Sequence, residues 1–166
     1  MSLTHLVLLL CSSGDLRTLQ CFKVNFDATV FRRSNLAGIG VIACNHDGEA
    51  AGALSSPIPM AQSMADLEAL ACLKAVQFAL EIGFTRVVFE GDSAVIINAL
   101  LHSAGELASF GNILDDIRLH SSIFQFMEFV HVNRNCNSVL MLSLRKLSQT
   151  LGLRCGCMIC QLILSL

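Results

Sequence analysis

The chain has 166 residues, of which 54% are hydrophobic and 14% charged, and its formal net charge is −2. This length favours one domain with a sizeable buried core, and the composition excludes a disordered chain. The net charge excludes a general positive field that would attract nucleic acid, so any such binding has to come from a local patch.

The first clear element is a strand at residues 22–31. Its side chains alternate between two faces, with Val24, Phe26 and Ala28 on one and Asn25, Asp27 and Thr29 on the other. An acid within a central strand that has an apolar face is uncommon unless the acid is used. Asp27 is therefore the first candidate functional residue.

Two further strands complete an antiparallel meander. Residues 36–44 predict the second strand, and its glycines suggest a bulge or a close backbone approach. Asp47-Gly48 predicts a tight hairpin turn, because glycine adopts positive φ readily. The third strand is expected at residues 49–56, and we expect Pro57 and Pro59 to end it.

The period changes from two to about 3.6 after Pro59. Apolar residues recurring in three- and four-residue steps predict an amphipathic helix over residues 61–82, and Gly83 is suited to end it. The remaining predictions are strands at 85–90 and 123–132 and helices at 94–102, 112–121 and 137–151. This order predicts a mixed α/β sheet with helices packed on its faces.

We divide the chain into an extension of uncertain structure (1–21), a folded domain (22–150) and an apolar, cysteine-rich tail (151–166). Neither apolar end is long enough for a confident transmembrane span, so no membrane partner is expected. The eight cysteines are irregularly spaced, which favours reduced, mostly buried thiols in an intracellular protein, cytoplasmic or nuclear. Cys155, Cys157 and Cys160 lack a fourth ligand in the tail, which disfavours a zinc site.

Three acids on different elements are the candidate site: Asp27 in the first strand, Glu68 on the long helix and Asp92 after the fourth strand. Functional groups in such sheets gather where neighbouring strands diverge. Carboxylate oxygens suit hard cations such as Mg²⁺ or Mn²⁺, and two such ions can activate water for phosphodiester cleavage. We therefore predict that these acids converge into one metal-binding cluster.

Each acid also has an ordinary interpretation when it is taken alone. Glu68 fits a solvated helix residue, and Asp92 fits the N-cap of the next helix, a role that Ser93 could also take. The joint placement of the three acids is what favours the metal site.

Six fragments, in this order, resemble the ribonuclease H superfamily, in particular the reverse-transcriptase-like ribonuclease H domains common in plants. They are Lys23-Val-Asn-Phe-Asp27, Gly38-Ile-Gly40-Val-Ile, Asp47-Gly48, Glu68-Ala-Leu, Phe89-Glu-Gly-Asp92-Ser93, and His131-Val-Asn-Arg134 followed by Asn137. The resemblance covers residues 22–145 and implies a five-stranded mixed sheet, three strands antiparallel and then two parallel, flanked by helices.

The resemblance also implies an activity and its residues. Asp27, Glu68 and Asp92 match the family's metal-binding acids, which implies hydrolysis of the RNA strand of an RNA–DNA hybrid with two Mg²⁺ or Mn²⁺ ions. Arg134 is the best candidate for a phosphate contact, with Asn25 and Asn137 as further nucleic-acid contacts. A solvated Arg134 is an equally good interpretation, and Asn137 also fits a helix cap.

One departure bears on catalysis. A fourth acid commonly opens the family's last helix, and its position here is Met141, which cannot bind a hard cation. The loss weakens the second ion site, so a second hypothesis stays open: a catalytically silent module that kept the fold and binds nucleic acid or a protein partner.

Overall fold

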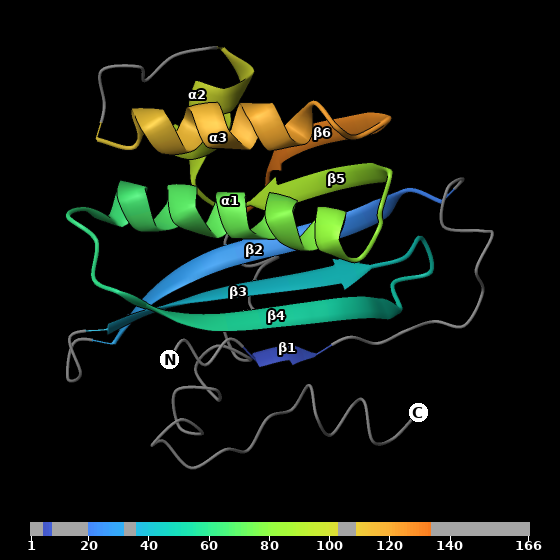
Figure 1. Cartoon of the computed structure of the whole chain (residues 1–166), viewed down its shortest axis with the longest axis horizontal. Helices are drawn as coiled ribbons and strands as arrows, with labels where there is room; N and C mark the ends of the chain where they lie inside the picture. The colour runs from blue at the N-terminus through green and yellow to red at the C-terminus, as the bar shows by residue number, and fades with distance from the viewer. Residues whose placement is uncertain (1–4, 8–19, 32–35, 103–108, 134–166) are drawn as a thin grey trace.

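The computed structural model describes residues 5–7, 20–31, 36–102 and 109–133 (Figure 1). The elements are β1 (His5–Val7), β2 (Phe22–Phe31), β3 (Leu36–Cys44), β4 (Ala50–Pro59), α1 (Met64–Glu81), β5 (Arg86–Gly91), α2 (Ala94–Leu101), α3 (Gly111–Ser121) and β6 (Phe126–His131).

The strands form one sheet in the order β1-β4-β3-β2-β5-β6. Strands β2, β3 and β4 pair antiparallel, whereas β2, β5 and β6 run parallel to one another. This confirms the five-stranded mixed sheet. Strand β1 adds an edge strand from the N-terminal extension, and it pairs antiparallel with residues 53–55 of β4.

The core lies between the sheet and its helices. Helix α1 packs on β2 and β3 and against α3, as Figure 1 also shows. The alternation expected in β2 is confirmed, because Val24, Phe26 and Ala28 are buried in the core cluster. Phe26 and Phe89 are among its largest fully buried side chains. The central strand is therefore fixed by packing on one face and by pairing on both edges.

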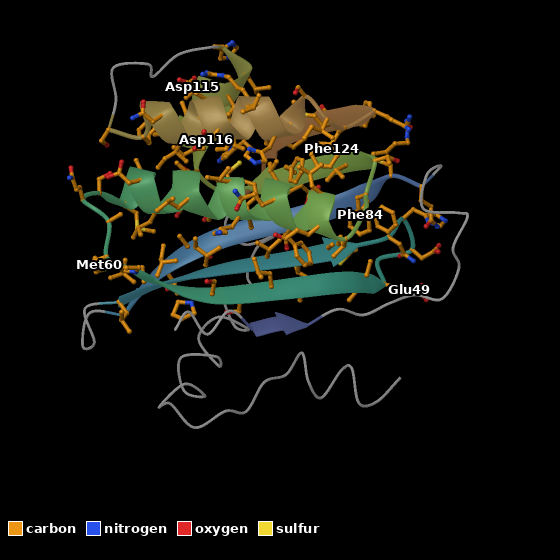
Figure 2. All side chains as sticks on the ribbon, in the orientation of Figure 1. Glu49, Met60, Phe84, Asp115, Asp116 and Phe124 are labelled. Carbon is orange, nitrogen blue, oxygen red and sulfur yellow. The ribbon has the colours of Figure 1, made fainter. Side chains whose placement is uncertain are left out.

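The turn between β3 and β4 has the predicted hairpin chemistry. Gly48 has φ +82°, and the Asn45 Oδ1 accepts hydrogen bonds from the N–H groups of Asp47 at 3.0 Å and Glu49 at 2.9 Å. Figure 2 shows Glu49 at this end of the sheet and Met60 at the other, where β4 leads towards α1. The β3–β4 register shift lies at Ala43/Cys44, away from the two glycines of β3.

The prediction that the prolines end the third strand holds for Pro59, which is the last residue of β4, but not for Pro57, which lies within the strand. Pro57 pairs opposite Gly38 and Pro59 opposite Leu36, so the strand runs three residues beyond the expected end at residue 56. A proline is tolerated where its missing N–H would have pointed away from the neighbouring strand. On the outer side, β1 pairs only as far as Ser55, so no ladder bond to β1 is lost at the prolines.

Helix α1 starts three residues later than expected because a capping box sets its first turn. Ser63 Oγ accepts from the Asp66 N–H at 3.1 Å, and the Asp66 Oδ2 accepts from the Ser63 N–H at 2.9 Å. At the other end Gly83 has φ +80° and donates to the Leu80 carbonyl at 3.0 Å, which confirms its terminating role. The next residue, Phe84, stacks on Phe22 with ring centroids 3.8 Å apart.

The remaining described elements lie within one to three residues of their predicted bounds. The predicted helix at 137–151 and the tail at 151–166 lie outside the described residues. Cys21, Cys44 and Cys72 carry free thiols. None of the helices in the described ranges is long and apolar enough to cross a membrane.

Candidate metal centre

Two of the three candidate acids lie just beyond the paired parts of two neighbouring parallel strands, at the same end of the sheet. Strands β2 and β5 pair as far as Asn25 and Glu90, and the acids follow two residues later on each strand. Because parallel strands have their carboxyl ends at one edge of the sheet, Asp27 and Asp92 emerge side by side where β2 continues and β5 stops.

The third acid comes from α1, which crosses this region. Glu68 lies in the second turn of the helix and is only 5% exposed, so the interpretation as a solvated helix residue is wrong. Asp92 does not cap α2 either. The N-cap position belongs to Ser93, whose side chain makes no capping hydrogen bond. Neither ordinary interpretation accounts for these two acids.

The structure brings Asp27, Glu68 and Asp92 together, each with a carboxylate oxygen within 4.8 Å of the others. Ligands on opposite sides of an ion lie about 4.2 Å apart for Mg²⁺, and about 4.6–5.2 Å apart for Ca²⁺. The three oxygens are therefore close enough together for one divalent cation to reach all of them once the side chains adjust. Within the described residues the cluster contains no His or Cys, a donor set that suits a hard cation.

Gathering the acids has an energetic cost. Asp27 is 1% exposed and Glu68 5%. Two ionised carboxylates within 4.8 Å repel each other by about 3 kcal/mol at an effective dielectric constant of about 20. A bound cation would reverse the sign of this local electrostatic energy. The fold thus holds together three groups that favour a positive ion between them.

Cys72 lies one helical turn after Glu68 and is fully buried. Burial raises the pKa of the Cys72 thiol far above its usual range, and the negative charge of Glu68 adds to the rise. Cys72 therefore stays a neutral thiol at physiological pH and supplies packing beside the cluster.

Two polar residues lie next to the cluster. His131, at the end of β6, donates from Nε2 to the Asp92 carbonyl oxygen at 3.2 Å. Asn25 donates from Nδ2 to the Glu90 Oε2 at 2.9 Å, and Lys23 Nζ lies 3.3 Å from the Glu90 Oε1. Asn25 is thus held two residues before Asp27, and its predicted contact with nucleic acid stays a prediction.

A third buried acid, Asp66, is near Glu68 in sequence but belongs to a separate hydrogen-bond network. Its carboxylate accepts from the Ser63 N–H and from the Ser109 hydroxyl, which joins the start of α1 to the segment before α3. The Ser109 hydrogen bond is the main reason that the pKa of Asp66 is lowered. Sequence reasoning missed this network, although the Ser63-x-x-Asp66 spacing is a capping-box signal.

Arg134, Asn137 and Met141 lie outside the described residues, so the predictions for them stay predictions. Two neighbours of the acids, Gly91 and His131, stand in the fragments that carry the family resemblance. Their contacts could not be deduced from those fragments, because they depend on how β2, β5 and β6 pack.

Comparison with known protein families gives a match to the model described as reverse transcriptase-like, over residues 25–141. The chain belongs to this family. The family lies within the ribonuclease H superfamily, which confirms the resemblance seen in the sequence. The matched range includes all three clustered acids and ends at Met141.

Solved structures agree on the fold. RNase H1 from the halophilic archaeon Halobacterium salinarum is 20% identical, with a TM-score of 0.67 over 74% of this chain and 92% of that one. The N-terminal RNase H domain of Mycobacterium tuberculosis rv2228c is 15% identical, with a TM-score of 0.65 over 73% and 88%. LC11-RNase H1, isolated from compost by a metagenomic approach and solved with an RNA/DNA hybrid, is 18% identical, with a TM-score of 0.64 over 73% and 91%. The search of curated protein sequences finds no match.

Proposed function

We propose that this ribonuclease H-like domain binds RNA–DNA hybrids and hydrolyses their RNA strand with divalent metal ions, Mg²⁺ or Mn²⁺. The observation that carries the proposal is the convergence of Asp27, Glu68 and Asp92 within 4.8 Å. Close carboxylates repel when they are ionised, and a cation held between them turns this repulsion into attraction. Family membership, and a relative solved with an RNA/DNA hybrid, support the choice of substrate.

In this proposal the three acids hold the metal through their carboxylate oxygens. The bound ions would supply an activated water and stabilise the charge that develops on the phosphate. Asp27 and Glu68 are buried, so they offer rigid ligands, whereas the half-buried Asp92 lies at the solvent side of the cluster. His131 holds the backbone carbonyl of Asp92 and so orients the loop that carries this ligand.

Substrate binding is proposed to rely on few basic residues. The described lysines and arginines all have a partner in the protein. Lys23 faces Glu90, Lys74 donates to Gln77, Arg118 binds Asp115 and the Ala99 carbonyl, and Arg86 lies over the Phe126 ring. Phosphate contacts are proposed for Arg134 by its likeness to the family, with Asn25 and Asn137 as further contacts to the nucleic acid. We also propose an intracellular location, in the cytoplasm or nucleus, because the irregular spacing of the eight cysteines favours reduced thiols.

The test is cleavage of a labelled RNA–DNA hybrid in Mg²⁺ and in Mn²⁺, with Asp27→Asn as the control. We expect cleavage of the RNA strand that falls at least about 100-fold in the variant, because one ligand carboxylate is lost. A labelled DNA duplex of the same sequence checks that the RNA strand is the target. Absence of cleavage by a folded protein in both metals would contradict the proposed activity.

A second candidate is a catalytically silent module that binds nucleic acid or a protein partner. Met141 in the position of the fourth acid favours it, because methionine cannot complete a second hard-ion site. The two candidates separate in one assay. The silent module binds the hybrid in a mobility shift without cleaving it in either metal, whereas the enzyme cleaves it.

A further inference from the structure

The two strands that carry Asp27 and Asp92 touch through one close contact immediately before these acids. The last β2–β5 pair is Asn25 with Glu90, so the next residue on each strand is Phe26 and Gly91, and the acids follow. Any change in how Phe26 meets Gly91 acts on the backbone directly attached to both carboxylate residues.

Gly91 leaves no room for a side chain. A Cβ atom there would lie 2.5 Å from the Phe26 Cζ and 2.7 Å from its Cε2, well inside the closest approach of real carbon atoms. The backbone of Gly91 does not have positive φ, so glycine is required by space and not by conformation. The Phe26 ring therefore rests on the bare backbone of Gly91.

Neither partner can move aside easily. Phe26 is 1% exposed within the core, so its ring has no open volume to enter. Gly91 is held from the other side by β6, where it pairs with His131 and its carbonyl accepts from the Val132 N–H at 3.0 Å. His131 also binds the Asp92 carbonyl. A displacement at Gly91 is thus passed on to Asp92.

We propose that the Phe26–Gly91 contact is a positioning contact that sets the separation of the Asp27 and Asp92 carboxylates and thereby the affinity for Mg²⁺. The inference rests on the proposed function, because it assigns the cluster to a metal. Mg²⁺ demands near-ideal geometry at 2.0–2.1 Å, so shifts of a few tenths of an ångström lower its affinity. Residues that only orient ligands commonly change metal affinity by about 10- to 100-fold.

The test measures Mg²⁺ binding to the full chain by calorimetry and by the metal-dependent rise in melting temperature. Gly91→Ala is expected to weaken Mg²⁺ binding about 10-fold. Phe26→Leu in the same chain removes the ring atoms that would clash. The double variant is therefore expected to bind Mg²⁺ within about 3-fold of Phe26→Leu alone.

The chain offers a matched control at a second tight glycine. A Cβ atom at Gly52 would lie 3.0 Å from the Phe78 Cζ, between β4 and α1 and away from the acids. Gly52→Ala is expected to lower the melting temperature in the same way as Gly91→Ala but to keep the Mg²⁺ affinity of the unmodified protein. This separates positioning of the ligands from general loss of stability.

The outcomes are distinguishable. No Mg²⁺ response in the unmodified protein would overturn the proposed function and the inference with it. A normal response that is unchanged in folded Gly91→Ala would overturn the inference alone. If Gly91→Ala does not fold, Phe26→Leu with Gly91 retained decides. It is expected to weaken Mg²⁺ binding about 3-fold, and unchanged affinity would overturn the positioning role.

Discussion

Two regions at the start of α1 contain buried acids, and the protein treats them in opposite ways. At the capping region, Asp66 receives hydrogen bonds from the Ser63 N–H and the Ser109 hydroxyl, so donors of the protein satisfy its charge. Two residues later, Glu68 meets the carboxylates of Asp27 and Asp92. The same helix thus carries one acid that stabilises the fold and one that is placed among like charges.

The difference separates structural from functional burial. A buried carboxylate with its own donors stabilises the native state whether or not a ligand is present. Buried carboxylates gathered together lower stability until a cation arrives. Substitutions of Asp66 and of Glu68 should therefore differ in whether added metal changes the stability of the variant.

The largest effect is expected for Glu68→Gln, which removes a charge from the cluster. The cleavage rate should fall at least about 100-fold, because a metal ligand is lost. For the same reason the Mg²⁺-dependent rise in melting temperature should fall to near zero. In chelator, relief of repulsion should raise the free energy of unfolding by about 1 kcal/mol. Urea unfolding with EDTA and with Mg²⁺ measures both. A fall in stability in EDTA would contradict the account of the cluster.

Asp66→Asn should show the reverse pattern. The amide cannot accept from both Ser63 and Ser109, so the free energy of unfolding should fall by about 1–3 kcal/mol in EDTA and in Mg²⁺ alike. Ser109→Ala, which leaves the capping box intact, should cost about 1 kcal/mol. The same urea series measures these values. If a folded Asp66→Asn protein lost its stabilisation by Mg²⁺, Asp66 would have to be counted as part of the metal site.

The smallest effect on stability is expected when the exposed ion pair between Lys23 and Glu90 is removed. Lys23 lies 3.3 Å from Glu90, but its side chain is 63% exposed. Lys23→Ala should therefore change the free energy of unfolding by no more than about 0.5 kcal/mol, and less at high salt. Thermal unfolding at low salt and at about 1 M salt tests this. A larger, salt-independent loss would mean that Glu90 belongs with the buried acids.

Much of the frame could be predicted from the sequence because its signals are local. The alternation in residues 22–31 and the apolar run at 36–44 gave the bounds of β2 and β3 as the structure has them. The continuation of β4 past Pro57 to Pro59 could not be predicted in this way, since a strand tolerates proline only where its missing N–H faces no neighbouring strand. That neighbour is known only once the strand order is known.

The acids of the site were found through motifs, but their surroundings were not. Asp27, Glu68 and Asp92 stand in recognisable fragments, and the structure brings them together. The contact of Phe26 with Gly91 depends on the register in which β2 and β5 pair, and no short sequence pattern encodes that register. The role of Asp66 had a capping signal, yet Ser109, its other partner, lies 43 residues further along the chain.

The outer edge of β4 has a consequence for how the molecule avoids self-association. An open strand edge invites pairing with another chain, and proteins protect such edges with short strands and prolines. Here β1 covers residues 53–55, and Pro57 and Pro59 follow without N–H donors to offer. Because β1 is only three residues long, it exposes little new edge. Among the described residues, β1 and the two prolines thus leave few backbone donors of this edge open to pairing with another chain.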